Sequence, residues 1–180
     1  MQSGYTCIIM SQVAAPEVAV IDASFWINAE RSGLLEYLPD YFVLKAPVEV
    51  AREITFTLGQ SVPAQAATVF EEWHGKDLVE IVEPAGTFAR FYAGENQAIA
   101  FAALHGCMLL IDNSEARHFS RGPLRLRVVD SPTFAVFLYD QGRLTYEQTR
   151  EILRVSLAAR RVVREAVIVL AGLTRELRSP

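Results

Sequence analysis

Cysteine and histidine are scarce in this chain of 180 residues, which contains only two cysteines and three histidines. Cys7 and Cys107 lie far apart and do not have the spacing of a metal-binding or redox-active pair. The histidines are scattered along the chain as well. This scarcity argues against a disulfide scaffold and against a zinc site, and we expect free thiols in a reducing, cytoplasmic environment.

Long apolar runs are also lacking, although 51% of the residues are hydrophobic and 21% are charged. The longest candidate, residues 166–173, is too short to cross a bilayer, which takes about 20 residues. Residues 1–20 lack the basic start and continuous apolar stretch of a signal peptide. The sequence has no glycine-rich phosphate loop, nucleophile elbow or Rossmann fingerprint. We therefore expect a globular protein without a membrane partner.

Charge is distributed unevenly around a net value of −4. Residues 1–112 carry 14 acidic and 5 basic side chains, whereas residues 113–180 carry 7 acidic and 12 basic ones. An acidic part followed by a basic part is compatible with a metal site beside a phosphate-binding surface. It is also typical of helices that are simply solvated by their basic residues, and charge taken alone slightly favours this second interpretation.

The order of hydrophobic segments predicts an α/β protein. Short, fully apolar strands alternate with helices, which indicates an open parallel sheet of about five strands covered by helices on both faces. The strands are expected at residues 18–22, 41–44, 78–82, 107–111 and 126–129. Residues 1–17 read as a loosely ordered leader, residues 18–158 as one domain, and residues 159–180 as an additional C-terminal helix that packs on the domain or on a partner.

Four acidic residues are expected at one edge of this sheet. Asp22 and Asp112 each end an apolar strand, and sites in open α/β sheets form beyond the carboxyl ends of the strands. Glu95 opens a helix after Gly94, and Glu53 lies on a helix that starts at Pro47. Carboxylates that converge repel one another, and a divalent cation removes that conflict. Ligation by oxygen atoms alone favours Mg²⁺ or Mn²⁺.

Each of these acids also has a purely structural interpretation. Asp22 and Asp112 are well placed to cap the helices that follow them, and Glu95 suits the positive N-terminus of its helix. For a single acid the two interpretations are about equally good. The occurrence of four such acids, each positioned at the same edge, favours a functional site.

The same four segments resemble the motifs of PIN-domain nucleases. Residues 20–28 (VIDASFWIN) resemble the family's opening strand, with an Asp at its end and a Ser two positions later. Residues 47–54 (PVEVAREI) resemble the second motif, residues 94–100 (GENQAIA) the third, and residues 109–117 (LLIDNSEAR) the fourth. The resemblance extends over about residues 18–157 and includes the end of VapC-like proteins at residues 131–144.

This resemblance implies a metal-dependent ribonuclease, commonly the toxin of a toxin–antitoxin pair. It assigns metal binding and catalysis to Asp22, Glu53, Glu95 and Asp112, with Mg²⁺ or Mn²⁺ as the cofactor. Ser24 is implied as a supporting residue. Asn113 departs from the family, because many relatives have a second acid at this position, and Glu115 is a possible substitute. Glu49 is a second acid in the Glu53 motif and serves as the reserve choice there.

Arginines follow the last of the four motifs, with Arg117 and Arg121 as the nearest candidates to bind RNA phosphates. The expected partners are an RNA substrate, a small antitoxin protein and, through residues 159–180, a second copy of the chain. Two alternatives are kept. The first is a PIN-like binding or regulatory module with weak or lost catalysis, favoured by Asn113. The second is a Mg²⁺-dependent phosphotransfer or phosphatase domain, which would need an Asp nucleophile, usually with a Lys or Thr partner.

Overall fold

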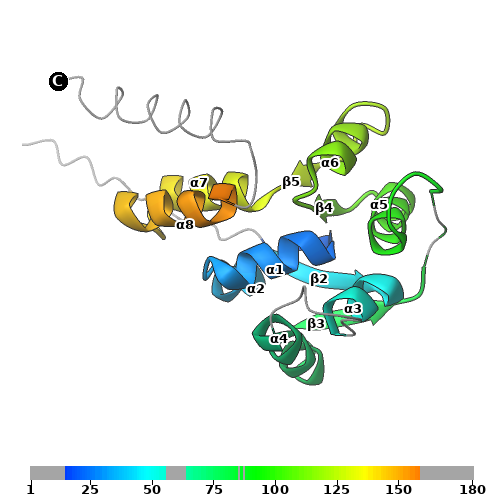
Figure 1. The fold of residues 1–180 in the computed structure, drawn as a ribbon, viewed down its shortest axis with the longest axis horizontal. Coiled ribbons are helices and arrows are strands. Elements are labelled where there is room, and N and C mark those ends of the chain that lie inside the picture. Colours follow the sequence, from blue (N-terminus) through cyan, green and yellow to red (C-terminus); the bar gives the residue numbers. More distant parts are fainter. Residues whose placement is uncertain (1–14, 56–63, 85, 87, 159–180) are drawn as a thin grey trace, which may run out of the picture.

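The fold is a five-stranded, all-parallel open sheet flanked by helices, seen in a computed structural model that describes residues 15–55, 64–84, 86 and 88–158 (Figure 1). The strand order is β3-β2-β1-β4-β5. The α/β class and the five parallel strands predicted from the sequence are therefore confirmed. The strands are β1 (Glu17–Ile21), β2 (Phe42–Pro47), β3 (Val79–Val82), β4 (Met108–Leu110) and β5 (Val128–Val129).

Helical segments connect every pair of consecutive strands, as parallel pairing requires. They are α1 (Ala23–Arg31), the 3-10 turn η1 (Leu35–Tyr37), α2 (Leu38–Tyr41), α3 (Val48–Thr55), α4 (Ala64–Gly75), α5 (Ala93–His105), α6 (Ser114–Arg121), α7 (Ser131–Asp140) and α8 (Tyr146–Ala158). In Figure 1, α7 and α8 lie side by side at one end of the molecule, α5 and α6 lie at the other, and β4 and β5 run between them.

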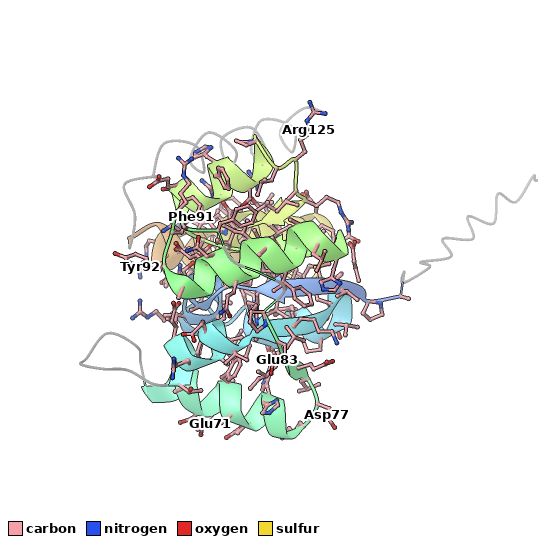
Figure 2. All side chains as sticks on the ribbon, turned by 90° about the vertical axis from the view of Figure 1, so that its right-hand side faces the viewer. Glu71, Asp77, Glu83, Phe91, Tyr92 and Arg125 are labelled. Atoms are coloured by element: carbon pink, nitrogen blue, oxygen red, sulfur yellow. The ribbon has the colours of Figure 1, made fainter. Side chains whose placement is uncertain are left out.

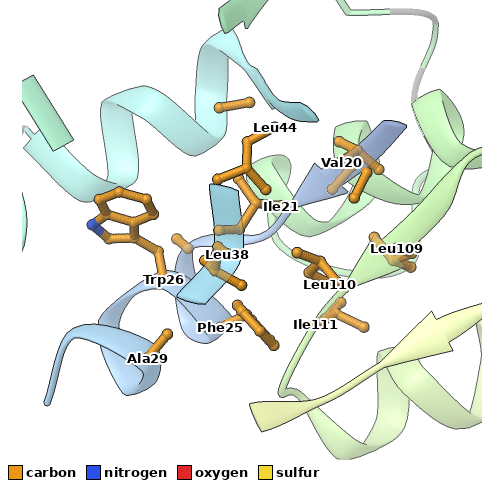
Figure 3. Packing of buried hydrophobic residues seen from close by; sticks show 14 of the residues in the cluster. Val20, Ile21, Phe25, Trp26, Ala29, Leu38, Leu44, Leu109, Leu110 and Ile111 are labelled. Atoms are coloured by element: carbon orange, nitrogen blue, oxygen red, sulfur yellow. The ribbon is translucent and has the colours of Figure 1, made fainter. Parts of the chain in front are cut away.

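The core is continuous around the central strand β1 (Figure 3). Ile21 and Leu110 are register partners on β1 and β4, and both side chains are fully buried. Trp26 of α1 meets the rings of Phe70 and Trp73 on α4 edge to face, at centroid distances of 5.2 and 5.3 Å. Its indole nitrogen donates to the Ala66 carbonyl oxygen at 2.9 Å. These contacts fix α1, and with it the strand end from which α1 departs.

The start of one helix differs from the prediction. Pro47 ends β2 instead of opening a helix, because the chain continues its pairing with β3 as far as the Pro47–Val82 register pair. The helix that carries Glu53, α3, begins at Val48. The N-cap of α1 is Asp22, whose side chain accepts from the Ser24 amide.

The domain boundaries can be compared only in part with the structure. The predicted leader and the predicted C-terminal helix lie almost entirely outside the described residues. The last described helix, α8, begins with a capping box, in which Thr145 and Gln148 exchange hydrogen bonds of 2.8 and 3.3 Å. No helix of the described residues is both long and apolar enough to cross a membrane.

Candidate active site

Two strand-end aspartates lie together at the carboxyl edge of the sheet. Asp22 follows β1 and Asp112 follows β4, and these strands are neighbours in the sheet. The Asp22 amide donates to the Leu110 carbonyl oxygen at 2.9 Å, which continues the strand pairing up to this point. The hydroxyl of Ser24 connects the two acids, since it donates to Asp22 Oδ2 and accepts from the Asp112 amide at 3.3 Å. The expected proximity of Asp22 and Asp112 is therefore present.

The carboxylate of Asp22 is almost fully enclosed, with 1% of the residue exposed. One oxygen, Oδ2, caps α1 by accepting from the Ser24 amide at 2.9 Å and from the Ser24 hydroxyl. The other oxygen, Oδ1, is buried and has no hydrogen-bond partner in the part of the chain that the structure describes. A buried carboxylate oxygen without a donor is costly, so this atom marks a place where a positive charge would be stabilising.

The pKa of Asp22 is raised by its surroundings. Burial raises it from an ordinary value of 3.8 to about 7, against the lowering effect of the hydrogen bonds from Ser24. The negative charges of Glu95 and Glu53 raise it further. Three of the four predicted acids are thus close enough for their charges to interact. Without a cation, Asp22 holds a proton near neutral pH.

Glu53 is held by the backbone at the start of α5. Its Oε1 accepts from the Gly94 amide at 2.9 Å, which joins α3 to α5 beside the strand ends. Burial raises the pKa of Glu53, the Gly94 amide lowers it, and the neighbouring charge of Glu49 raises it. A second bond, from the Glu49 amide to Gln97 Oε1 at 3.1 Å, holds the same two helices together.

Gly94 is glycine because the Glu53 carboxylate occupies the space of a side chain. A Cβ at this position would lie 2.5 Å from Glu53 Oε2 and 2.7 Å from Glu53 Cδ. The sequence predicts Gly94 just before the helix, but Gly94 lies in the first turn of α5, whose N-cap is Tyr92. Its role is to let the carboxylate approach the helix N-terminus.

Replacing Gly94 by alanine should lower activity and leave the stability of the fold nearly unchanged. We expect G94A to displace the Glu53 carboxylate, which is the movable end of a flexible side chain. If Glu53 holds a metal, as the motif resemblance implies, the RNA cleavage expected from that resemblance should fall about tenfold. Helical alanine is favourable, so the thermal midpoint should change little. The control is G75A at the end of α4, where no atom lies within 4 Å of an added Cβ. Equal cleavage by G94A and G75A would contradict this role of Gly94.

Asp112 is the most firmly held of the four acids. Its Oδ1 accepts from the Ser131 amide at 2.8 Å, and its Oδ2 accepts from the Ser131 hydroxyl at 2.8 Å and from the Asn28 side-chain amide. Only 1% of the residue is exposed. A carboxylate with this many donors has a fixed orientation, which is the typical setting of a metal ligand that is supported by surrounding groups.

The remaining predicted residues differ in how deeply they are buried. Glu95 is buried in the first turn of α5, with 7% of the residue exposed. Glu49 pairs with Arg52 at 3.2 Å on the surface, which favours Glu53 over Glu49 as the site residue of this motif. Asn113 caps α6 through bonds to the amides of Glu115 and Ala116. The Glu115 side chain is exposed and lies 3.7 Å from Arg90.

The fit of these residues to a divalent cation is partial. Among the described residues, no three side chains of His, Cys, Asp or Glu are arranged as a complete ligand set. The unpartnered Oδ1 of Asp22, and the repulsion that Asp22 experiences from Glu95 and Glu53, nevertheless fit an oxygen-ligated cation.

The two arginines predicted to bind RNA do not face this site as free cations. Arg117 forms an ion pair with Asp130, and only 12% of its side chain is exposed. Arg121 donates to the Val128 carbonyl oxygen at 2.8 Å, where β5 begins. That position is at the amino edge of the sheet, opposite the strand-end acids, because all five strands are parallel. The placement does not support the prediction that Arg121 contacts RNA at the site.

Three residues of this network were not anticipated. Asn28 and Ser131 hold Asp112, and Asp130, 3% exposed, caps α7 at the end of β5. Asp130 had a signal in the sequence, since it follows an apolar strand in the same way as Asp22 and Asp112. Asn28 and Ser131 lie within segments that resemble PIN proteins, but neither stands out by itself, because a polar residue within or beside an amphipathic helix is ordinarily solvated.

No protein-family model and no curated protein matches the chain. The resemblance to PIN domains therefore depends on the four sequence motifs alone.

Proposed function

We propose that this protein is a metal-dependent ribonuclease that hydrolyses RNA phosphodiester bonds, and that it is the toxin of a toxin–antitoxin pair. The single observation that carries the hydrolytic part is the buried, unpartnered Oδ1 of Asp22 next to the charges of Glu95 and Glu53. An acid in this setting is stable as an anion only if a cation balances it. The four motifs that resemble PIN domains supply the RNA substrate and the toxin role.

Asp22, Glu95, Glu53 and Asp112 would hold the cation, which is Mg²⁺ or Mn²⁺ because every donor is a carboxylate oxygen. When bound, the ion lowers the pKa of a water molecule and stabilises the negative charge that develops on the phosphate. Neighbouring side chains and one backbone amide would hold these acids in place. Ser24 orients Asp22, the Gly94 amide orients Glu53, and Ser131 with Asn28 orients Asp112.

The direct test is RNA cleavage by the purified protein with added Mn²⁺ and with excess EDTA. We expect cleavage of a single-stranded RNA in Mn²⁺, loss of cleavage in EDTA, and recovery when Mn²⁺ is restored. The products should be those of direct hydrolysis by water, because the reaction requires no covalent intermediate with the protein. Cleavage that persists in EDTA after dialysis would contradict a role for the metal. A small antitoxin-like reading frame directly upstream of the gene would support the toxin role.

A second function is favoured by two specific observations. The Asn113 side chain is used to cap α6, and no complete ligand set is preformed within the described ranges. Both fit a PIN-like binding module that has lost productive metal binding. A thermal melt distinguishes the two proposals: Mn²⁺ raises the melting midpoint of the nuclease and leaves that of the binding module unchanged.

A further inference from the structure

The start of α7 holds Asp112 because β4 and β5 run side by side to their carboxyl ends. The Ile111 amide donates to the Val129 carbonyl oxygen at 3.0 Å, which carries the pairing of these strands one residue past the end of β4. Just beyond this pair, Ser131 gives its amide and its hydroxyl to the Asp112 carboxylate, at 2.8 Å each. Two donors to this acid therefore depend on the position of a single residue.

The first turn of α7 is built on Asp130, the residue before Ser131. Asp130 Oδ1 accepts from the Thr133 amide at 2.9 Å, and its carbonyl oxygen accepts from the Phe134 amide at 2.9 Å. Only 5% of the Asp130 side chain is exposed, so its carboxylate requires a balancing positive charge. A displacement of this carboxylate would displace the adjacent residue that binds Asp112.

Arg117 supplies the balancing charge from α6. Its guanidinium forms an ion pair with Asp130 Oδ2, and only 12% of its side chain is exposed. Its backbone amide donates to the carbonyl oxygen of Asn113, the residue that follows Asp112 and caps α6, at 2.9 Å. The contacts form a closed circuit. The chain leads from Asp112 to Arg117, Arg117 reaches Asp130, and the residue after Asp130 binds Asp112 again.

We infer that Arg117 and Asp130 are positioning residues, and that their ion pair holds Ser131 against the Asp112 carboxylate. This inference rests on the proposed function and deepens it, because it gives Arg117 a role in the geometry of the carboxylate site in place of contact with RNA. A buried ion pair need not stabilise a fold more than an apolar pair of similar volume. Groups that orient a metal ligand, in contrast, typically change metal affinity by about tenfold to a hundredfold.

Two other roles of the ion pair make different predictions. A pair that only stabilises the fold affects Ser131 no more than it affects the rest of the sheet. A pair that acts through its charges changes cation binding in opposite directions, since loss of the Arg117 cation strengthens it and loss of the Asp130 anion weakens it. Positioning predicts a third result: either loss weakens cation binding, because Ser131 no longer holds Asp112.

The first test measures hydrogen exchange of the Ser131 amide by NMR in metal-free buffer, with the Asp22 amide as reference. The reference amide donates to the Leu110 carbonyl oxygen at 2.9 Å and reports the pairing of β1 with β4. The variants are R117M, D130N and the double variant R117M/D130N. Asparagine is a good N-cap, so D130N keeps the start of α7 and removes only the charge. We expect both single variants to speed exchange at Ser131 roughly tenfold relative to the reference.

The double variant separates positioning from stability. It removes both buried charges together, so its melting midpoint should recover from the losses of the single variants. Exchange at Ser131 should nevertheless remain fast, since the ion pair is still absent. The second measurement is Mn²⁺ affinity by titration below the melting range of every variant, and we expect all three to bind roughly tenfold more weakly than the wild-type protein.

The matched control is R154M, which breaks an exposed ion pair with Glu151 on α8 and should leave both measurements unchanged. Three results would overturn the inference: wild-type exchange at Ser131 in the double variant, an equal rise at Ser131 and Asp22 in that variant, or stronger Mn²⁺ binding by R117M with weaker binding by D130N. Failure of the nuclease proposal has a different signature. In that case exchange at Ser131 responds as expected, but Mn²⁺ does not bind or produces no cleavage.

Discussion

Replacing Asp22 by asparagine should abolish RNA cleavage, with a loss of about a thousandfold or more. The metal contribution to such reactions is several kcal/mol, and each 1.36 kcal/mol corresponds to a factor of about ten. Asparagine keeps an oxygen that accepts from the Ser24 amide, so the cap of α1 is retained. What is lost is the anionic Oδ1, the atom that lacks a partner. The measurement is single-turnover cleavage in Mn²⁺ together with a thermal melt.

The matched control for D22N is D40N, because Asp40 lies on the surface and pairs with Arg143 at 2.7 Å, away from the strand ends. D40N should cleave like the wild-type protein. A D22N protein that melts normally and cleaves at the wild-type rate would remove Asp22 from the site, and with it the proposed chemistry.

The metal-free protein should become less stable as the pH rises from about 4 to about 7. The raised pKa of Asp22, about 7 in place of 3.8, means that the folded protein holds a proton in this range while the unfolded chain has released it. A folded state that binds more protons loses stability with rising pH. At 1.36 kcal/mol for each unit, the contribution of Asp22 amounts to about 4 kcal/mol, present below pH 4 and lost by pH 7.

Urea unfolding of the wild-type protein and of D22N in EDTA, at several pH values, isolates this contribution. The stability of D22N should depend less on pH. The stability of D22N relative to the wild-type protein should therefore be greater at pH 8 than at pH 4. Saturating Mn²⁺ should restore the stability of the wild-type protein at pH 8 and have no such effect on D22N. Parallel pH dependences for the two proteins would show that Asp22 is ionised in the metal-free fold.

The sequence was sufficient to place the acids at one edge of the sheet. Asp22 and Asp112 each follow an apolar strand, and the carboxyl ends of parallel strands necessarily point to the same edge. The sequence could not show that β1 and β4 are neighbours, because strand order depends on tertiary packing. That adjacency brings Asp22 and Asp112 together through the hydroxyl of Ser24.

Other parts of the site depend on contacts that no local pattern encodes. Ser131 meets Asp112 because α7 starts beside the end of β4, and the glycine at position 94 is explained only by Glu53 from a distant helix. The positions of the arginines also depend on tertiary contacts. Arg117 pairs with Asp130 after β5, whereas α6 carries the chain on toward the opposite edge, where Arg121 donates to Val128 and Arg127 pairs with Glu17. Figure 2 shows Arg125 at the top of the molecule and Tyr92 at its left side.

The strand order also determines when the site first exists during synthesis. Its central contact joins Ser24 to Asp112, which are 88 positions apart, and Asp112 is held in turn by Ser131. A ribosome-bound chain that has not yet released these later residues has no assembled site, whatever its early part has folded into. If the protein is the ribonuclease proposed above, translation of each copy is well advanced before that copy can attack the message or the machinery that produced it.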